Sequence, residues 1–309
     1  MCGIAGIVKQ SGVRAERPLL EHMIGMVNHR GPDAAGFHLS GSVGLAHARL
    51  SIIDVGGGHQ PMHNEDKTVW ITFNGEIFNY VELREDLIKK GHKFQTQSDT
   101  EVIVHLYEEK GEDCVQYLNG QWAFAIWDSR NERLFLSRDR VGVRPLFYAK
   151  TAEGFVFGSE IKSLLVVPSV PRAIDLEALD ELFTFWVTLP SRTIFTGVSE
   201  LPPGHSLVFH HGDVRIQPYW TLDYNPSSGP KTEEEAREGL LELLLDATRI
   251  RLRSDVPVGA YLSGGLDSTV IAALVKKLGT THLRTFSVAF EDKEFDESSF
   301  QNEASAFLK

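Results

Sequence analysis

The amino-acid sequence predicts an α+β N-terminal domain followed by an α/β domain. Up to about residue 220, short runs of β-branched and apolar residues alternate with a few capped helix patterns. The stretch 224–231 is rich in Pro, Gly and Ser and poor in apolar residues, which indicates a linker. After it come a strand, a glycine-rich turn, a helix and a second strand, the order of a βαβ unit that begins a parallel sheet.

Cap and turn residues give the bounds of the elements in the first domain. Asn79 opens a helix pattern that ends near Lys90, and a capping box at 98–101 opens a second helix that Gly111 closes. Period-2 or apolar patterns between turn signals predict the strands. We expect strands at 42–53, 69–73, 122–127, 134–137, 146–149, 154–157, 207–209 and 214–216, and helices at 79–90, 98–111 and 176–185.

The second domain begins with another capping box, formed by Thr232 and Glu235, and a helix to about Arg253. Strands at 256–262 and 285–290 then flank a helix at 268–278. Only 41 residues follow Ser268 (309 − 268). A doubly wound sheet needs several more strands and helices on both faces. We therefore expect the sequence to be a fragment of a longer protein.

Composition and charge argue against several classes of protein. The net charge of −11 opposes binding to nucleic acid or to an anionic membrane. The sequence has neither an apolar run of about 18 residues nor a basic-then-apolar leader, so we expect a cytoplasmic protein without a membrane span. The two cysteines, Cys2 and Cys114, support neither a disulfide framework nor a cysteine-rich metal site. Cys114 lies in an apolar-patterned segment, where we expect a buried small hydrophobe.

Cys2 is the most informative residue of the chain. Once Met1 is removed, one residue carries both a thiol and a free α-amine that can act as its base. A thiol with a pKa near 8.5 and an amine with a pKa near 8 are matched for proton transfer at neutral pH. The arrangement is the cysteine counterpart of an N-terminal threonine nucleophile. The alternative is an incidental cysteine near the terminus.

A second motif, Ser263-Gly264-Gly265-Leu266-Asp267-Ser268, lies between a strand pattern and a helix pattern. Two adjacent glycines allow backbone N–H groups to close on an anion, and the helix adds its positive N-terminal end. The hydroxyls of Ser263 and Ser268 donate to phosphate oxygens, and Asp267 holds a Mg²⁺ ion that bridges them. The alternative is a glycine turn with a serine cap.

The two motifs together make the chain resemble the glutamine-hydrolysing asparagine synthetases over nearly its whole length. Several segments carry the resemblance, and the earlier ones are shared by class II amidotransferases in general. They are 1–6 (MCGIAG), 29–33 (HRGPD), 47–54 (HARLSIID), 73–80 (FNGEIFNY), 98–101 (SDTE), 138–140 (RDR) with Gly142 and 144–146 (RPL), and 263–268 (SGGLDS). The last of these selects the asparagine synthetase branch.

The resemblance implies a four-layer α/β/β/α sandwich of the N-terminal-nucleophile fold, followed by the start of an α/β parallel-sheet ATP-pyrophosphatase-type domain. It places a glutaminase domain at 1–223, a linker at 224–231 and an incomplete ATP domain at 232–309. Members are carbon–nitrogen ligases that hydrolyse glutamine and pass ammonia through a tunnel to an aspartyl-adenylate, giving asparagine, AMP and pyrophosphate. The small molecules that the resemblance implies are glutamine, aspartate, ATP as a substrate, and Mg²⁺. Whether the protein forms a homodimer stays open.

The resemblance also assigns the catalytic residues. Cys2 attacks the glutamine side-chain amide to give a thioester. Asn74, through its side-chain amide, and Gly75, through its backbone N–H, form an oxyanion hole, and we expect both in a turn after a strand. The competing interpretation of Asn-Gly is a type I′ hairpin turn.

The implied glutamine-binding residues surround that hole. Arg49 holds the substrate α-carboxylate, since its planar fork fits two carboxylate oxygens. Glu76 and Asp99 hold the α-ammonium, and Asp99 also suits a helix N-terminus. Backbone groups of Leu50, Ile52 and Ile53 add further contacts. For Arg49 the alternative is a solvated strand arginine.

The remaining implied sites leave alternatives open. Leu262 and Val288 match nucleotide-base contacts, or they are core residues. Arg30, Asp139, Arg140 and Arg144 fit family motifs, with either gating or structural ion pairs as their role. Phe78 stands where the family often has tyrosine. The competing functions are a class II amidotransferase with another carboxylate acceptor and a non-catalytic regulatory paralogue.

Overall fold

A computed structural model describes residues 1–10, 12–224, 229–279 and 283–308. The chain divides into two units, Met1–Leu222 and Asp223–Lys309. Of the expected linker at 224–231, residues 225–228 lie outside the described residues. No helix in the described ranges has both the length and the apolar character that crossing a membrane requires.

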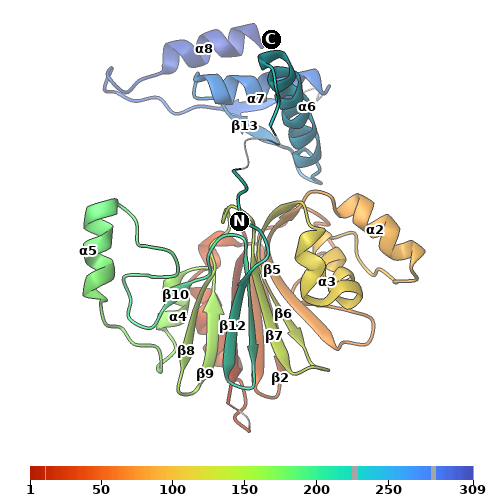
Figure 1. Cartoon of the computed structure of the whole chain (residues 1–309), viewed down its shortest axis with the longest axis vertical. Helices are drawn as coiled ribbons and strands as arrows, with labels where there is room; N and C mark the ends of the chain where they lie inside the picture. Colours follow the sequence, from red (N-terminus) through yellow and green to blue (C-terminus); the bar gives the residue numbers. More distant parts are fainter. Residues whose placement is uncertain (11, 225–228, 280–282, 309) are drawn as a thin grey trace. The chain divides into compact units, whose positions relative to one another are not determined.

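The first unit contains two six-stranded sheets, sheet A with the order β10-β8-β9-β1-β3-β2 and sheet B with the order β12-β11-β7-β6-β5-β4 (Figure 1). Neighbouring strands are antiparallel in both. Sheet A comprises β1 (Gly3–Lys9), β2 (Ala34–Ser40), β3 (Val43–Arg49), β8 (Phe147–Thr151), β9 (Gly154–Gly158) and β10 (Ser199–Glu200). Sheet B comprises β4 (Met62–His63), β5 (Val69–Ile77), β6 (Gly120–Asp128), β7 (Arg133–Arg138), β11 (His205–His210) and β12 (Asp213–Pro218).

Helices cover the outer faces of the two sheets. The first core cluster joins helix α1 and helix α4 to sheet A, and the second joins helix α3 to sheet B. The helices of the unit are α1 (Arg17–Gly25), α2 (Tyr80–Lys89), α3 (Asp99–Lys110), α4 (Ile161–Leu165) and α5 (Leu176–Phe185), with 3₁₀ turns η1 (Asn28–Arg30) and η2 (Gly111–Gln116). The result is the four-layer α/β/β/α arrangement that the resemblance implies.

Alternation along the strands builds the core between the two sheets. In β1, Ile4 and Val8 face sheet B, whereas Ala5 and Ile7 pack against the helices on the other side. In β6, residues 123, 125 and 127 face sheet A, and residues 122, 124 and 126 face helix α3. Because both faces of these strands are buried, their sequences are nearly continuous apolar runs.

The second unit has a parallel pair of strands, β13 (Gly259–Tyr261) and β14 (Arg284–Phe286), as the βαβ pattern predicts. Its helices are α6 (Glu233–Arg251), α7 (Leu266–Lys277) and α8 (Ser298–Phe307). Among the described residues, its core cluster contains three buried side chains, those of Leu262, Ala272 and Ala304. The fold class predicted from the sequence, α+β followed by α/β, is confirmed.

Several local predictions were wrong. The strand expected at 42–53 ends at Arg49, and the predicted turn at Asn74-Gly75 lies inside strand β5. Asn79 precedes α2, but its side chain donates to the Tyr117 carbonyl and does not cap the helix. Helix α7 begins at Leu266, so Ser268 lies within its first turn and is not its cap.

Candidate active site

Cys2 lies directly before strand β1, and its thiol faces the end of strand β3. The Leu50 N–H donates to Cys2 Sγ at 3.3 Å, and Sγ lies 3.6 Å from the Leu50 carbonyl oxygen. Arg30 Nε donates to the Cys2 carbonyl at 3.0 Å, while Arg30 Nη1 binds Glu160 Oε1 at 3.0 Å. The contact with Leu50 positions the Cys2 thiol, and the contact with Arg30 holds the Cys2 backbone. Arg30 therefore has a structural role at the chain terminus.

Burial shifts the pKa values of the thiol and of the terminal amine in opposite directions, and both shifts favour the neutral form of the group. Burial raises the pKa of the Cys2 thiol, although the hydrogen bond from Leu50 and the positive amine oppose the rise. Burial also lowers the pKa of the terminal α-amine, which Met1 carries in this chain. An amine with a lowered pKa is more often neutral at physiological pH and can accept a proton.

Asn74 and Gly75 lie in strand β5, opposite Ala123 and Trp122 of strand β6. Long-range pairing therefore overrides the local turn preference of Asn-Gly. Asn74 is 1% exposed, and neither polar atom of its side chain has a hydrogen-bond partner among the described residues. Buried amide groups are almost always paired, so this pair of atoms is available to a ligand.

Gly75 has no room for a side chain. A Cβ atom at this position would lie 2.1 Å from the Gln121 carbonyl oxygen and 2.8 Å from the Trp122 Cα. Both contacts are with backbone atoms of strand β6, which cannot rotate away. Glycine at 75 thus allows β5 to approach β6 and keeps Asn74 in register beside the Cys2 pocket.

Arg49 ends strand β3 as a buried cation, 5% exposed. Its Nη1 donates to the Val55 carbonyl at 3.1 Å and its Nη2 to the Asp54 carbonyl at 2.6 Å. Within the described part of the chain, Arg49 forms no ion pair with a carboxylate. The predicted alternative, a solvated strand arginine, is therefore wrong. A buried guanidinium without a counter-ion favours an anionic ligand.

Asp99 is the first residue of helix α3 and is 5% exposed. Its Oδ2 accepts the Ile77 N–H at 2.9 Å, and its Oδ1 lies 3.4 Å from the Ser98 hydroxyl. Burial raises the pKa of Asp99 to about 6, even though these hydrogen bonds favour the charged form. A carboxylate in a pocket whose charged form is destabilised by burial is typical of a ligand-binding group.

The capping box predicted at 98–101 forms only in part. The Ser98 hydroxyl accepts the Thr100 N–H at 3.2 Å. The carboxylate of Glu101 does not return to the Ser98 N–H. It accepts from the backbone N–H groups of Gln95 and Thr96, each at 2.7 Å. The Glu101 side chain thereby shapes the loop before the helix, which packs beside the pocket.

One cavity of about 70 Å³ brings the predicted glutamine-site residues together. Cys2, Arg49, Leu50, Ile52, Ile53, Asn74, Gly75, Glu76 and Asp99 all line it. Further lining residues were not predicted to bind glutamine, and they are Met1, Gly58, Gln60, Phe73, Ser98, Thr100 and Arg144. Gln60 connects two of these segments, since it accepts the Phe73 N–H at 2.7 Å and donates to the Thr100 hydroxyl at 3.1 Å.

The loop at 139–144 places Arg144 at the same cavity. The buried Asp139 carboxylate accepts the backbone N–H groups of Trp122, Val141, Val143 and Arg144 at 3.0–3.2 Å. Arg140 Nη1 donates to the Leu118 carbonyl at 2.7 Å. Asp139 and Arg140 therefore hold the loop in place. Burial lowers the pKa of the Arg144 guanidinium, which nearby Glu76 opposes.

In the second unit, the glycine-rich motif forms a turn between β13 and α7. Ser263 Oγ and Ser268 Oγ lie 3.0 Å apart, and the Gly265 N–H faces Ser263 Oγ at 3.3 Å. Gly264 has φ +86°, and a Cβ there would lie 2.8 Å from the Gln301 backbone nitrogen. The motif therefore requires glycine at 264, and its hydroxyls face solvent at the N-terminus of α7.

The other three residues predicted to bind ATP or Mg²⁺ have different surroundings. Leu262 is 1% exposed and belongs to the core of the unit, with its N–H bonded to the Phe286 carbonyl at 2.9 Å. Val288 is 61% exposed, and its carbonyl accepts from Gln301. Asp267 is exposed in the first turn of α7.

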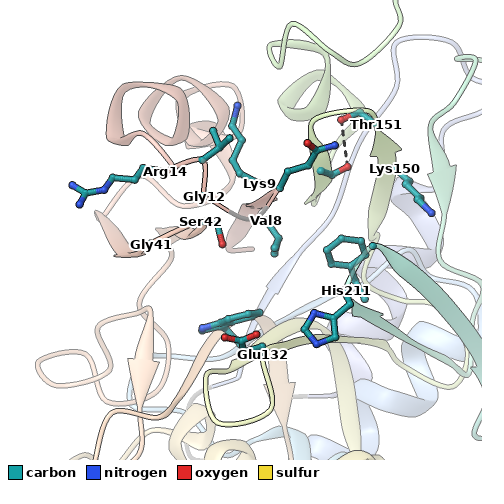
Figure 2. Close-up of a pocket in the computed structure, with 16 residues that line it drawn as sticks. Val8, Lys9, Gly12, Arg14, Gly41, Ser42, Glu132, Lys150, Thr151 and His211 are labelled. Atoms are coloured by element: carbon teal, nitrogen blue, oxygen red, sulfur yellow. Dashed lines mark hydrogen bonds between the residues drawn. The ribbon is translucent and has the colours of Figure 1, made fainter.

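A larger cavity of about 850 Å³ lies at the opposite end of strand β1 from Cys2 (Figure 2). It opens between the turns of sheet A, including Gly41 and Ser42, and the hairpin tips of sheet B that carry Glu132 and His211. None of the residues predicted to bind glutamine or ATP lines it. The cavity that unites the predicted residues is thus the smaller one.

Comparison with models of known protein families identifies the family of this chain. A family model described as glutamine amidotransferase domain matches residues 1–220. The chain belongs to this family. A second model, described as asparagine synthase, matches residues 239–309, within the second unit of the glutamine amidotransferase chain.

Individual relatives agree with this assignment. Asparagine synthetase [glutamine-hydrolyzing] 3 of Bacillus subtilis (strain 168) is 40% identical over 314 residues, which cover 97% of this chain and 50% of the relative. Amidase chyE of Penicillium rubens is 34% identical over 337 residues, which cover 100% of this chain and 49% of the relative. The chain therefore spans about half the length of these relatives.

A solved structure supports the fold of this family member. Glutamine phosphoribosylpyrophosphate amidotransferase from B. subtilis superposes with a TM-score of 0.53 at 19% sequence identity. The match covers 95% of this chain and 68% of that structure. At this identity the likeness concerns the fold alone, and it agrees with the N-terminal-nucleophile sandwich expected from the sequence.

Proposed function

We propose that the first unit hydrolyses glutamine to glutamate and ammonia, and that the whole protein is a glutamine-hydrolysing asparagine synthetase. One observation carries the first part. A single small cavity contains the Cys2 thiol, the buried guanidinium of Arg49 and the buried amide of Asn74. Among the described residues, Arg49 has no ion pair and the Asn74 amide has no hydrogen-bond partner. A structural core has no need of these three together, whereas an amide hydrolase that takes a free amino acid needs each of them.

Hydrolysis proceeds in two steps from these residues. With Met1 removed, the Cys2 α-amine takes the thiol proton as Sγ attacks the amide carbon of glutamine. Asn74 Nδ2 and the Gly75 N–H donate to the oxygen that becomes negative. The amine returns the proton to the leaving nitrogen, ammonia departs, and a thioester remains. Water then attacks the thioester, which releases glutamate and restores the thiol.

The charged groups of the cavity select a free amino acid. Arg49 binds the α-carboxylate of glutamine, and its two carbonyl contacts keep the guanidinium oriented for that purpose. Asp99 and Glu76 bind the α-ammonium, and backbone groups of Leu50, Ile52 and Ile53 contact the substrate. The buried positive and negative groups together favour a zwitterion.

The proposed synthetase activity uses aspartate and ATP in the second unit. The exposed hydroxyls of Ser263 and Ser268, with Gly264, Gly265 and the N-terminus of α7, fit phosphate groups. Asp267 in the same turn fits Mg²⁺, which would neutralise phosphate charge when bound. Leu262 and Val288 would lie near the nucleotide base. Aspartate would be activated as an adenylate and ammonia would attack it, giving asparagine, AMP and pyrophosphate.

Cys2→Ala tests the hydrolytic proposal. We expect glutamate release from glutamine to be abolished, because among the described residues that line the cavity Cys2 alone carries a thiol. Mass spectrometry should first establish that Met1 is absent from the purified chain. Cys114→Ala is the matched control, since Cys114 is fully buried in the core against sheet B. It should keep kcat and lower the thermal midpoint.

Glutamate release by purified Cys2→Ala at the rate of the unaltered chain would remove Cys2 from the mechanism. The acceptor is tested on the full-length protein with aspartate, ATP and glutamine. The similarity to an amidase favours a second candidate, an amidotransferase with another carboxylate acceptor. Glutamine-dependent AMP formation at the same rate with and without aspartate would support this second candidate instead.

A further inference from the structure

We propose that Glu65, His92, His105 and Glu108 form a binding site for a divalent transition metal, with Zn²⁺ as the best fit. Their ligand atoms all lie within 4.8 Å of one another. The two histidine Nδ1 atoms are 3.1 Å apart, and His105 Nδ1 lies 3.0 Å from Glu108 Oε2. His105 Nδ1 lies 3.6 Å from Glu65 Oε2. Four ligands around one tetrahedral Zn²⁺ are separated by about 3.3 Å, given metal–ligand bonds of about 2.0 Å.

Three separate segments contribute the four side chains. Glu65 lies in the turn between β4 and β5, and His92 lies in the loop between α2 and α3. His105 and Glu108 are three residues apart on helix α3, so they project from one face. Helices α2 and α3 lie side by side at the edge of sheet B (Figure 1). A bound ion would therefore join α3 to both neighbouring segments.

Each carboxylate presents one oxygen to the cluster while its other oxygen is held elsewhere. Glu108 Oε1 accepts from Asn64 Nδ2 at 2.7 Å, which leaves Oε2 facing His105. Glu65 Oε1 accepts the Lys93 N–H at 3.0 Å, which leaves Oε2 facing the same atom. Carboxylates fixed in this way are oriented as ligands before any ion arrives.

The far nitrogen of each imidazole also faces a carboxylate. His92 Nε2 lies 3.1 Å from Glu109 Oε1, and His105 Nε2 lies 3.7 Å from Glu101 Oε1. Metal-binding histidines commonly donate their second N–H to a carboxylate, which fixes the tautomer and directs the other nitrogen at the ion. The arrangement leaves both Nδ1 lone pairs directed into the space between the four side chains.

The ligand set selects the kind of ion. Two imidazoles with two carboxylates suit Zn²⁺, whereas Ca²⁺ and Mg²⁺ prefer oxygen ligands alone. A proton is the competing occupant. Burial disfavours the charged form of His105, but the neighbouring carboxylates of Glu101 and Glu108 outweigh this and raise its pKa to about 9. The metal must therefore displace that proton. A metal site and a protonated cluster lead to different experimental results.

The test uses the 309-residue chain, freed of metal with a chelator and titrated with zinc sulfate by calorimetry. We expect one Zn²⁺ per chain with a micromolar or tighter Kd, and a higher thermal midpoint with the metal bound. Cobalt(II) in place of zinc should show the visible absorption of a tetrahedral site. These readouts do not depend on glutaminase activity.

Four variants locate the ion. Glu65→Gln and His92→Gln remove ligands, and we expect each to weaken zinc binding by more than the ~10–100-fold that loss of an outer partner costs. Glu109→Gln removes an outer partner and should weaken binding by ~10–100-fold. His22→Gln, an exposed histidine of helix α1, is the matched control and should bind zinc as the unaltered chain does.

Two outcomes would overturn the proposal. The first is an unaltered chain that binds no zinc at micromolar concentrations, which would leave the cluster as a protonated ion network. The second is equal zinc affinity in the unaltered chain, Glu65→Gln and His92→Gln, which would place the ion elsewhere. Glu65 has a side chain 37% exposed, so its variant should fold even if the His92 variant does not.

Discussion

The residues at the Cys2 cavity keep polar groups that the fold does not use. Within the described residues, the two buried amide atoms of Asn74 have no hydrogen-bond partner, and the Arg49 guanidinium donates to two carbonyl oxygens. Each unpaired buried polar group costs roughly 1–3 kcal/mol of folding stability. A ligand that supplies a carboxylate and an oxyanion recovers this free energy on binding. The same residues should therefore lower stability while they support catalysis.

Asn74→Leu tests at one residue whether a group that supports catalysis lowers stability. Leucine has a similar size and no polar atoms, so we expect the thermal midpoint to stay level or rise. The loss of an oxyanion donor should reduce kcat for glutamine by ~10²–10³. Steady-state glutamate release and a thermal melt on the same preparation measure both effects. An unchanged kcat would exclude Asn74 from the oxyanion hole.

Asp99→Asn tests the buried carboxylate through pH. The folded-state pKa of about 6 lies above the ordinary 3.8, so folding disfavours the ionised form. Stability should therefore fall as pH rises from about 4 to about 6, by roughly 3 kcal/mol in total. Asparagine keeps an oxygen for the Ile77 N–H, so the variant should lose this pH dependence and melt no lower at neutral pH.

The same substitution should impair glutamine binding. In the unaltered chain we expect KM for glutamine to rise as pH falls below about 6, because protonated Asp99 no longer attracts the α-ammonium. In Asp99→Asn, KM should be high at every pH. A KM that stays at the level of the unaltered chain would assign the ammonium to another group of the cavity.

At the scale of elements, strand β5 shows where local patterns mislead. Asn-Gly is a strong hairpin signal when only neighbours in sequence are considered. In the structure, residues 69–77 pair along their whole length with β6, which lies some 50 residues away in the chain. A local pattern contains no information about that partner. The family resemblance found the correct residues because it rests on their identity and not on their conformation.

Helix starts show the same limit. Ser98 caps α3 as the sequence predicts, but Glu101 binds the loop directly before the helix, and Asn79 binds the distant Tyr117 carbonyl. The cluster of His92 with His105 was missed for a related reason. His105 and Glu108 have helical i, i+3 spacing that the sequence displays, yet Glu65 and His92 join them only through tertiary packing.

Gly75→Ala tests the close approach of β5 to β6. A methyl group 2.1 Å from the Gln121 carbonyl must push the strands apart, and we expect a loss of about 1–3 kcal/mol in unfolding free energy. The movement shifts Asn74, so kcat should fall as well. Gly25→Ala in helix α1 is the control, because nothing lies within 4 Å of its Cβ position. Equal stabilities for the two variants would contradict the packing argument.

At the scale of the whole molecule, the residue patterns predicted the classes of the two units, whereas the layering of the first was predicted from the family resemblance. Continuous apolar runs such as 122–127 indicate strands buried on both faces, and the structure places helices on one side and the second sheet on the other. Which strands share a sheet depends on contacts between segments as far apart in the chain as Ala5 and Gly158. Strand β1, for example, pairs with β9 and β3 at once.

The second unit contrasts with the first in how much it buries. Among the described residues, its core cluster has three buried members, Leu262, Ala272 and Ala304. Phe286, Val288 and Phe290 are each more than half exposed. Two strands rarely form a stable sheet alone. The first unit has three extensive core clusters and contains every residue of the proposed glutaminase.

This contrast predicts that the 309-residue chain performs the first half-reaction and not the second. We expect glutamate release from glutamine without ATP or aspartate, because all the residues that line the Cys2 cavity lie between 1 and 144, within the first unit. We expect no asparagine from aspartate, ATP and glutamine, because a two-stranded sheet offers too little structure to enclose an activated aspartate. Chromatography of both amino acids, with full-length asparagine synthetase 3 of B. subtilis as the positive control, measures the two outcomes. Asparagine made by the 309-residue chain would mean that the second unit binds its substrates on the surface formed by β13, α7 and α8.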